Sequence, residues 1–204
     1  MPKEKAGMAR LFAALLLLAA IAAGGLALYF KSSEGAADAA LPAVANGDVQ
    51  DPAALLKSLN EHLAKQPRDA RAWAILARLQ FEAERFPEAA QAYEKALALP
   101  TKVANDPALW CEYADALGMT QGGTLSGKPL ELVRRALAIS PHHPKALEMA
   151  GSAAYEQGDY AGALNYWRPL LAALEPGSKM HAELVAAIGR AERRAKVTIP
   201  VSSQ

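Results

Sequence analysis

The sequence has 204 residues and a mass of 21.6 kDa, enough for one ordinary domain and a smaller segment. Apolar residues make up 52% of it and aromatic residues only 6%, and its 47 Ala and 28 Leu far outnumber its 7 Val and 5 Ile. Because Ala and Leu favour helices whereas β-branched and aromatic residues favour strands, this composition argues against β-sandwiches, β-barrels and doubly wound sheets. The net charge of +1 disfavours a strongly basic nucleic-acid-binding protein and an acidic disordered tail.

Residues 11–30 form an apolar run without any charge, LFAALLLLAAIAAGGLALYF. As a helix, such a run spans roughly 30 Å, the thickness of a bilayer core. Three basic residues and one acidic residue precede it, so the positive-inside rule predicts a cytoplasmic N-tail (1–10), a transmembrane anchor (11–30) and a domain across the membrane. The competing interpretation is a secretory signal cleaved near Ala37-Asp38-Ala39, but the run exceeds the usual 7–15-residue apolar core of a signal, which favours the anchor.

Residues 31–50 have no apolar period and are rich in Ala, Gly, Ser and Asp, which is typical of a flexible linker. Asp51-Pro52 then offers an N-cap and a proline at the first helical position, and Pro67 ends the predicted helix. One face of this helix carries four leucines: Leu55, Leu56, Leu59 and Leu63. The pattern predicts an amphipathic helix over 51–66 at the start of a domain that extends to residue 196, followed by a C-terminal tail (197–204).

A helix-turn-helix repeat follows this first helix. Six residues fall at positions of the tetratricopeptide (TPR) pattern, which reads W-x₂-L-G-x₂-Y and continues with A-x₃-F and a later Ala. They are Trp73, Leu76, Ala77, Ala89, Tyr93 and Ala96. Gln80 is a mismatch, since the pattern has Tyr there. A cleaner copy contains Leu147, Ala150, Gly151, Gly158, Tyr160, Ala163, Trp167 and Leu170. Between the two lies a stretched copy that begins at Trp110 and has a polar, glycine-rich turn within 118–129.

The spacing predicts an all-α TPR solenoid of about three repeats with a capping helix at each end, the second over 178–195. Small residues such as Gly151 and Ala163 let two helices approach closely, and large ones such as Trp167 fill the space between pairs. In the second cap, we expect Leu184, Val185 and Ile188 to point inward. An irregular helical bundle is the alternative fold.

The sequence shows little that could perform catalysis. Cys111 is its single cysteine, which excludes a disulfide within the chain, a two-cysteine metal site and the C-x-x-C-H signature of covalent haem attachment. An enzyme using Cys111 would need a partner histidine placed by the fold. His142-His143 lies in a turn and indicates a solvated loop rather than a metal site, and His62 and His181 are expected at the surfaces of the cap helices. We therefore predict a non-enzyme without a cofactor or metal.

In a stack of helix pairs the first helix of each pair lines a groove, so the predicted function lies in a protein-binding surface. The expected groove residues mix charged and apolar side chains, which suits a peptide or helix of a partner. They are Arg71, Arg78, Phe81, Glu82, Cys111, Asp115, Met119, Lys145, Ser152, Tyr155 and Glu156.

The last two repeats carry a family resemblance. The stretched turn contains a G-x-L-x-G segment, Gly123 to Gly127, before an A-L-x-x-x-P helix end at Pro141, and Gly158-Asp159-Tyr160 and Trp167 follow. Over roughly residues 51–195 the sequence resembles the TPR proteins of bacterial cytochrome c maturation, of the CcmI/CycH type and the related NrfG type.

The resemblance implies an adaptor or chaperone in the inner membrane, with its TPR domain in the periplasm. Such a protein grips the C-terminal helix of apocytochrome c and delivers it to the haem lyase components of the maturation system. Members of the CcmI type have two membrane helices and a cytoplasmic loop, whereas this sequence has one apolar run, as expected for a short form. The alternative function is a generic TPR scaffold for another cell-envelope assembly.

Overall fold

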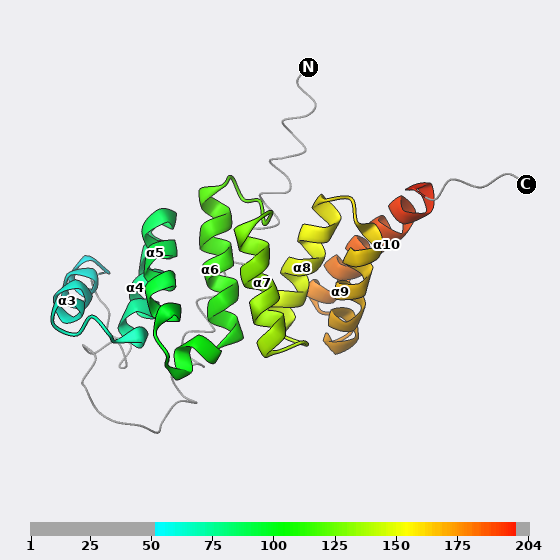
Figure 1. Cartoon of the computed structure of the whole chain (residues 1–204). Coiled ribbons are helices and arrows are strands. Elements are labelled where there is room, and N and C mark those ends of the chain that lie inside the picture. Colours follow the sequence, from blue (N-terminus) through cyan, green and yellow to red (C-terminus); the bar gives the residue numbers. More distant parts are fainter. Residues whose placement is uncertain (1–51, 199–204) are drawn as a thin grey trace, which may run out of the picture. The chain divides into compact units, whose positions relative to one another are not determined.

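The structure, a computed structural model, describes residues 52–198 (Figure 1). The predicted membrane anchor (11–30), the linker (31–50) and most of the tail (197–204) lie outside the described residues. Among the helices that the structure describes, none is long and apolar enough to cross a bilayer.

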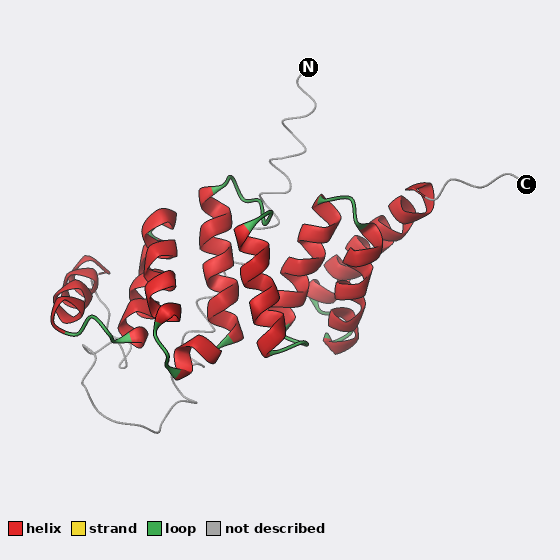
Figure 2. Ribbon diagram, in the orientation of Figure 1, coloured by secondary structure: helices red, strands yellow, loops and turns green. Residues whose placement is uncertain are grey.

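The described part of the chain consists of helices joined by loops and turns and contains no strand (Figure 2). Its helices, in chain order, are α3 (Pro52–Lys65), α4 (Ala70–Glu82), α5 (Phe86–Ala98), α6 (Pro107–Thr120), α7 (Lys128–Ile139), α8 (Pro144–Glu156), α9 (Tyr160–Ala173) and α10 (Lys179–Thr198), with a 3₁₀ turn η2 (Lys102–Asn105) before α6. This order confirms the all-α prediction.

The helices pack as three pairs, α4 with α5, α6 with α7 and α8 with α9, and each pair also packs on the next. The α3 helix packs on α4 and α10 packs on α9, so both predicted caps are present. The fold is therefore a TPR-like solenoid, as predicted. The stretched turn of the middle repeat is the loop 121–127, which is longer than the turns 83–85 and 157–159 of the other two pairs.

Polar residues directly before the helices fix where several of them begin. The Asp69 carboxylate accepts hydrogen bonds from the backbone N–H groups of Arg71 and Ala72. Asp106 and Asp159 cap α6 and α9 with one such bond each, from the N–H groups of Ala108 and Gly162. These caps satisfy N–H groups that have no partner within the helix.

The predicted packing residues lie in the core. Ala77, Ala89 and Ala163 are fully buried, and Gly151 is also buried. A methyl group at Gly151 would overlap the indole of Trp167, so the absence of a side chain lets α8 and α9 approach closely. The close approach confirms the expected role of small residues between paired helices.

Two predictions about the caps need correction. Val185 is 46% exposed rather than inward, because Leu184, Ile188 and Ala191 form the buried face of α10. His62 is not at the surface: its side chain is 12% exposed and its Nε2 lies 2.8 Å from Asp69 Oδ2, which joins the end of α3 to the start of α4. The α10 helix runs to Thr198.

Candidate protein-binding surface

All the predicted groove residues lie on the first helices of the pairs, α4, α6 and α8. We call the surface that they form the first-helix face. Its members are Arg71, Arg78, Phe81 and Glu82 on α4, Asp115 and Met119 on α6, and Lys145, Ser152, Tyr155 and Glu156 on α8. Cys111, which was predicted to line the groove, lies on α6 but is buried and is not part of this surface.

An ion pair joins α4 to α6 on this face. The Arg78 guanidinium donates two hydrogen bonds to the Glu112 carboxylate, from Nε to Oε2 at 2.8 Å and from Nη2 to Oε1 at 3.0 Å. The two side chains are 19% and 33% exposed. Because the pair is bidentate and half-buried, it fixes the relative position of two first helices more strongly than a single exposed contact would.

A second group of charges joins α6 to α8. The Lys145 ammonium lies 3.3 Å from the Asp115 carboxylate on α6 and 3.4 Å from Glu148 on its own helix. Burial alone would lower the pKa of Lys145, but the two carboxylates outweigh it and the pKa is raised. Burial raises the pKa of Asp115 in spite of the ammonium, since this acid also faces Glu148 and Glu112. The cluster holds more acid than base, so Lys145 stays protonated.

The structure places a histidine beside Cys111, which the sequence could not show. Cys111 Sγ lies 3.9 Å from His143 Nδ1, and that nitrogen also accepts a hydrogen bond from the Ala146 backbone N–H at 3.4 Å as the N-cap of α8. His143 is therefore half-buried and structural, not part of a solvated loop as predicted.

This pair is a poor nucleophilic site. Burial and the nearby Asp115 carboxylate raise the pKa of the Cys111 thiol to about 12, and the thiol is buried. Burial lowers the pKa of His143, which keeps its imidazole neutral. A catalytic cysteine needs a thiolate, and these surroundings disfavour one.

Aromatic side chains lie toward the ends of α4 and α8. Phe81 packs edge-on against Phe86 of α5 with ring centroids 5.3 Å apart. Tyr155 lies between Tyr160 and Trp167, at 5.2 and 5.7 Å. Trp167 is buried, whereas the phenylalanine and tyrosine rings are half-buried and provide apolar contact area that stays accessible in part.

Among residues 52–198, the remaining predicted residues form no hydrogen bond between side chains, ion pair or ring contact that joins two helices. Arg71, Glu82 and Glu156 are exposed, and Met119 and Ser152 are half-buried. The residues that sequence reasoning missed are Glu112, Glu148 and His143. Glu112 acquires its partner from another helix and His143 meets Cys111 from a turn, so the sequence carried little signal for these two. Glu148 pairs with Lys145 on its own helix, and the i,i+3 spacing of the two residues could have indicated that contact.

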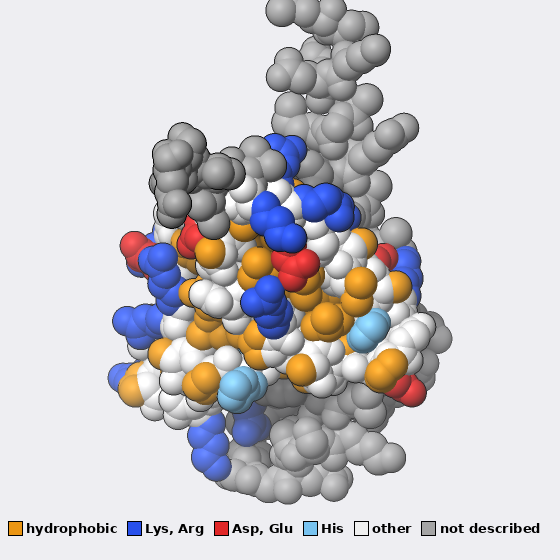
Figure 3. Space-filling view, turned by 90° about the vertical axis from the view of Figure 1, so that its right-hand side faces the viewer, with side chains coloured by type: hydrophobic (Ala, Val, Ile, Leu, Met, Phe, Trp, Pro, Cys, Tyr) orange, Lys and Arg blue, Asp and Glu red, His pale blue; other side chains and the backbone are white. Residues whose placement is uncertain are grey.

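Two large apolar side chains are exposed in the described residues, Ile139 on α7 and Val185 on α10. Figure 3 shows the side of the molecule on which α10 lies, where hydrophobic side chains are exposed between basic ones. Residues 52–198 contain no group of three or more His, Cys, Asp or Glu side chains that could hold a metal ion.

Helix pairs stacked in this way define a TPR protein, a class whose repeats present surfaces to other proteins. Solved structures agree on the fold. MamA matches with a TM-score of 0.54 and 13% sequence identity, and the match covers 72% of this chain and 90% of MamA. PilF of Pseudomonas aeruginosa matches with a TM-score of 0.55 and 14% identity, over 72% of this chain and 70% of PilF.

The family is more specific. Residues 37–181 match the cytochrome c-type biogenesis protein H TPR domain, and the chain belongs to this family. The cytochrome c-type biogenesis protein CycH of Rhizobium meliloti is 30% identical over 149 residues, 72% of this chain and 38% of the relative. CycH of Bradyrhizobium diazoefficiens is 30% identical over 118 residues, which are 58% of this chain and 31% of the relative. The chain thus spans about a third of the length of these relatives.

A shorter relative is covered more fully. The formate-dependent nitrite reductase complex subunit NrfG of Escherichia coli O157:H7 is 25% identical over 122 residues, which are 60% of each chain. Together these relatives confirm the resemblance to the CycH and NrfG types that the sequence indicated.

Proposed function

We propose that the chain is an adaptor of c-type cytochrome biogenesis that binds apocytochrome c through its first-helix face. The observation that carries this proposal is the family match over residues 37–181, which includes all three helix pairs. The names of the relatives, cytochrome c-type biogenesis protein CycH in three bacteria, support the same process.

The chemistry of the first-helix face favours a helix with apolar residues as its ligand. Arg78 and Lys145 are already bridged by carboxylates of the protein, so an acidic peptide would have to compete with those pairs. Phe81, Met119 and Tyr155 provide partly accessible apolar surface instead. A helix laid in a groove binds through such apolar anchors. The proposed ligand is therefore the C-terminal helix of apocytochrome c.

The proposal includes a location and a set of partners. The apolar run 11–30 anchors the chain in the inner membrane, with residues 1–10 in the cytoplasm and the TPR domain in the periplasm. There the chain passes its apocytochrome to the haem lyase components. Cys111 is buried with a raised pKa, which supports a role in holding the substrate while other proteins perform the thiol chemistry.

Calorimetry with the full chain in lipid nanodiscs tests the binding step. We expect apocytochrome c, but not the folded holo form, to bind, because only the unfolded chain exposes the apolar face of its last helix. Met119→Glu places a charge on the first-helix face and should weaken binding about tenfold. Val185→Glu is the matched control on exposed α10 and should leave binding unchanged. Equal binding by both variants would locate the contact elsewhere.

A deletion strain tests the process. Loss of haem-stained c-type cytochromes, restored by the wild-type gene, supports the proposed role. A normal cytochrome content with a defect in another envelope assembly would support the generic scaffold instead.

A further inference from the structure

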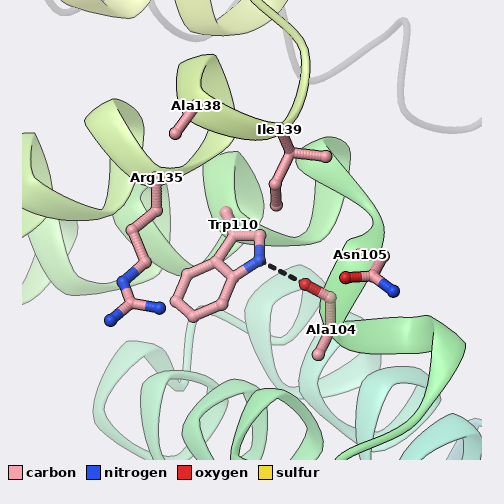
Figure 4. A pocket seen from close by; sticks show the side chains of 6 residues that line it. All are labelled: Ala104, Asn105, Trp110, Arg135, Ala138 and Ile139. Carbon is pink, nitrogen blue, oxygen red and sulfur yellow. Dashed lines mark hydrogen bonds between the residues drawn. The ribbon is translucent and has the colours of Figure 1, made fainter.

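A pocket of about 290 Å³ opens between η2, α6 and α7 (Figure 4). It is lined by Ala104, Asn105, Trp110, Arg135, Ala138 and Ile139. The Trp110 indole and the side chains of Ala138 and Ile139 give it apolar walls, while Asn105 and Arg135 place polar groups at its edge. An apolar cavity of about 150 Å³ can hold a benzene ring, so this pocket has room for one large side chain.

The floor of the pocket is held rigidly. Trp110 Nε1 donates a hydrogen bond to the Ala104 carbonyl at 2.9 Å, and the Arg135 guanidinium lies 5.2 Å from the centre of the indole ring. The ring is thereby fixed from its edge and from one face. A fixed aromatic surface loses little entropy when a ligand packs on it.

The first repeat provides a matched comparison. Trp73 Nε1 donates to the Pro67 carbonyl at 2.9 Å, and Lys95 lies 4.2 Å from the centre of that ring. The second repeat differs in two ways: η2 supplies the wall of Ala104 and Asn105, and Ile139 is 41% exposed at the rim. Both repeats thus place a cation over a tryptophan, so this arrangement alone does not explain the open apolar rim of the second repeat.

Arg135 lines the pocket, and the charged side chains of η2 and α7 that have no ion-pair partner within residues 52–198 are basic. Arg135 and its neighbour Arg134 are exposed on α7, and Lys102 is exposed on η2. None of the three belongs to an ion pair found between residues 52 and 198, whereas the bridging cations of the first-helix face are all neutralised. Asp106, the acid beside η2, is engaged as the N-cap of α6. An acidic ligand would complement this surface.

We propose that this pocket is a second protein-docking site, which receives an aromatic or large aliphatic side chain of an acidic partner segment while Arg135 pairs with a neighbouring carboxylate. The apolar side chain would lie on Trp110 and against Ile139, and the carboxylate would accept hydrogen bonds from the guanidinium edge that the indole leaves free. A buried anchor surrounded by a charged rim is the usual arrangement of a strong contact in a protein interface. The site shares only α6 with the first-helix face and does not depend on the function proposed above.

The three tryptophans of the chain make a direct test possible. The full chain, labelled with 5-fluorotryptophan and held in lipid nanodiscs, should give three ¹⁹F signals, assigned by Trp→Phe variants. The probes are soluble Gly/Ser-flanked peptides with Phe-Glu-Glu, Ala-Glu-Glu or Phe-Lys-Lys at their centre, added to about 1 mM. We expect Phe-Glu-Glu to shift the Trp110 signal in a saturable way, with the other two peptides at least about tenfold weaker.

Variants distinguish the pocket from a general attraction of charge. Arg135→Glu and Ile139→Glu should each weaken the Phe-Glu-Glu effect by about tenfold or more. Lys95→Glu makes the same charge change over Trp73 and should change it less than about twofold. Each variant changes an exposed residue, and a circular dichroism spectrum equal to that of the wild type confirms that the variant is folded. The proposal is overturned if Trp110 does not shift, if Trp73 shifts equally, or if Ala-Glu-Glu works as well as Phe-Glu-Glu.

Discussion

Replacing Gly151 by alanine should destabilise the protein, although the same change stabilises most helices. In a helix, alanine is favoured over glycine by about 1 kcal/mol. Gly151, however, faces the indole of Trp167: an added Cβ would overlap Nε1 and Cδ1 and lie 2.7 Å from Cε2. Since Trp167 is buried in a close-packed interior, its ring can move aside only by disturbing its neighbours.

The magnitude follows from opposing contributions. Overpacking in a core costs about 1–3 kcal/mol. A shifted ring also loses the hydrogen bond from Trp167 Nε1 to the Glu148 carbonyl, 3.3 Å long, which contributes about 1 kcal/mol. Against these stands the gain of about 1 kcal/mol in helix propensity. We therefore expect Gly151→Ala to lower the free energy of unfolding by about 1–3 kcal/mol.

Urea denaturation followed by circular dichroism measures this change, and Gly189→Ala is the matched control. Gly189 also lies inside a helix, α10, but an added Cβ there would meet only the Arg193 side chain at an ordinary 3.5 Å. The control should therefore be stabilised by up to about 1 kcal/mol. Two glycine-to-alanine changes in one protein would then have opposite signs.

A double variant tests the cause. The first repeat has Ala77 and Tyr93 at the positions of Gly151 and Trp167. Gly151→Ala combined with Trp167→Tyr should therefore be more stable than the sum of the single changes allows, by about 1 kcal/mol or more. Additive effects, or a stabilised Gly151→Ala variant, would refute the steric reasoning.

Three further changes have signs that the structure fixes. The Cys111 thiol has a pKa of about 12 in the folded protein and of 9.0 when free, so unfolding between these pH values releases a proton. The free energy of unfolding should therefore fall by up to about 4 kcal/mol as the pH rises through this range. The part due to Cys111 is the difference between the wild type and Cys111→Ala. Lys145→Met should cost about 3 kcal/mol in urea melts at pH 7 and less at acidic pH, because burial raises the pKa of Asp115 and a protonated Asp115 leaves no unpaired charge. Glu84→Gly should raise the melting temperature, corresponding to about 1 kcal/mol, since Glu84 has a φ of 58° where the third repeat has Gly158 at 79°.

The fold was predictable from the sequence because each repeat position has one packing role. Ala77 and Gly151 occupy the same place in two repeats, and both are buried between paired helices. A period of this kind can be counted along the chain without any knowledge of distances. The phase of a single helix is harder to predict. Val185 was expected inside, but α10 packs mainly on α9 and buries only a narrow face that contains Leu184 and Ile188.

The contacts of the candidate surface could not be predicted in the same way. Glu112 meets Arg78 across two repeats, and His143 meets Cys111 from the turn before α8. Such pairs depend on how neighbouring helix pairs are rotated and offset, which the repeat pattern does not encode. The sequence was enough to predict which helices form the first-helix face. It was not enough to predict how the charges on this face are paired.

That charge balance separates the two proposed surfaces experimentally. On the first-helix face, the bridging cations Arg78 and Lys145 are paired with carboxylates, so a ligand there gains chiefly from apolar contact. At the pocket, Arg135 has no carboxylate partner among the ion pairs of the described residues, so a ligand gains from charge. Salt screens exposed charges over about 8 Å at physiological ionic strength and over about 3 Å at 1 M. Raising the salt concentration should therefore weaken Phe-Glu-Glu binding at Trp110 while leaving apocytochrome binding to the first-helix face nearly constant. If apocytochrome binding were lost in salt and also in Arg135→Glu, the pocket would be its main binding site and the assignment to the first-helix face would be wrong.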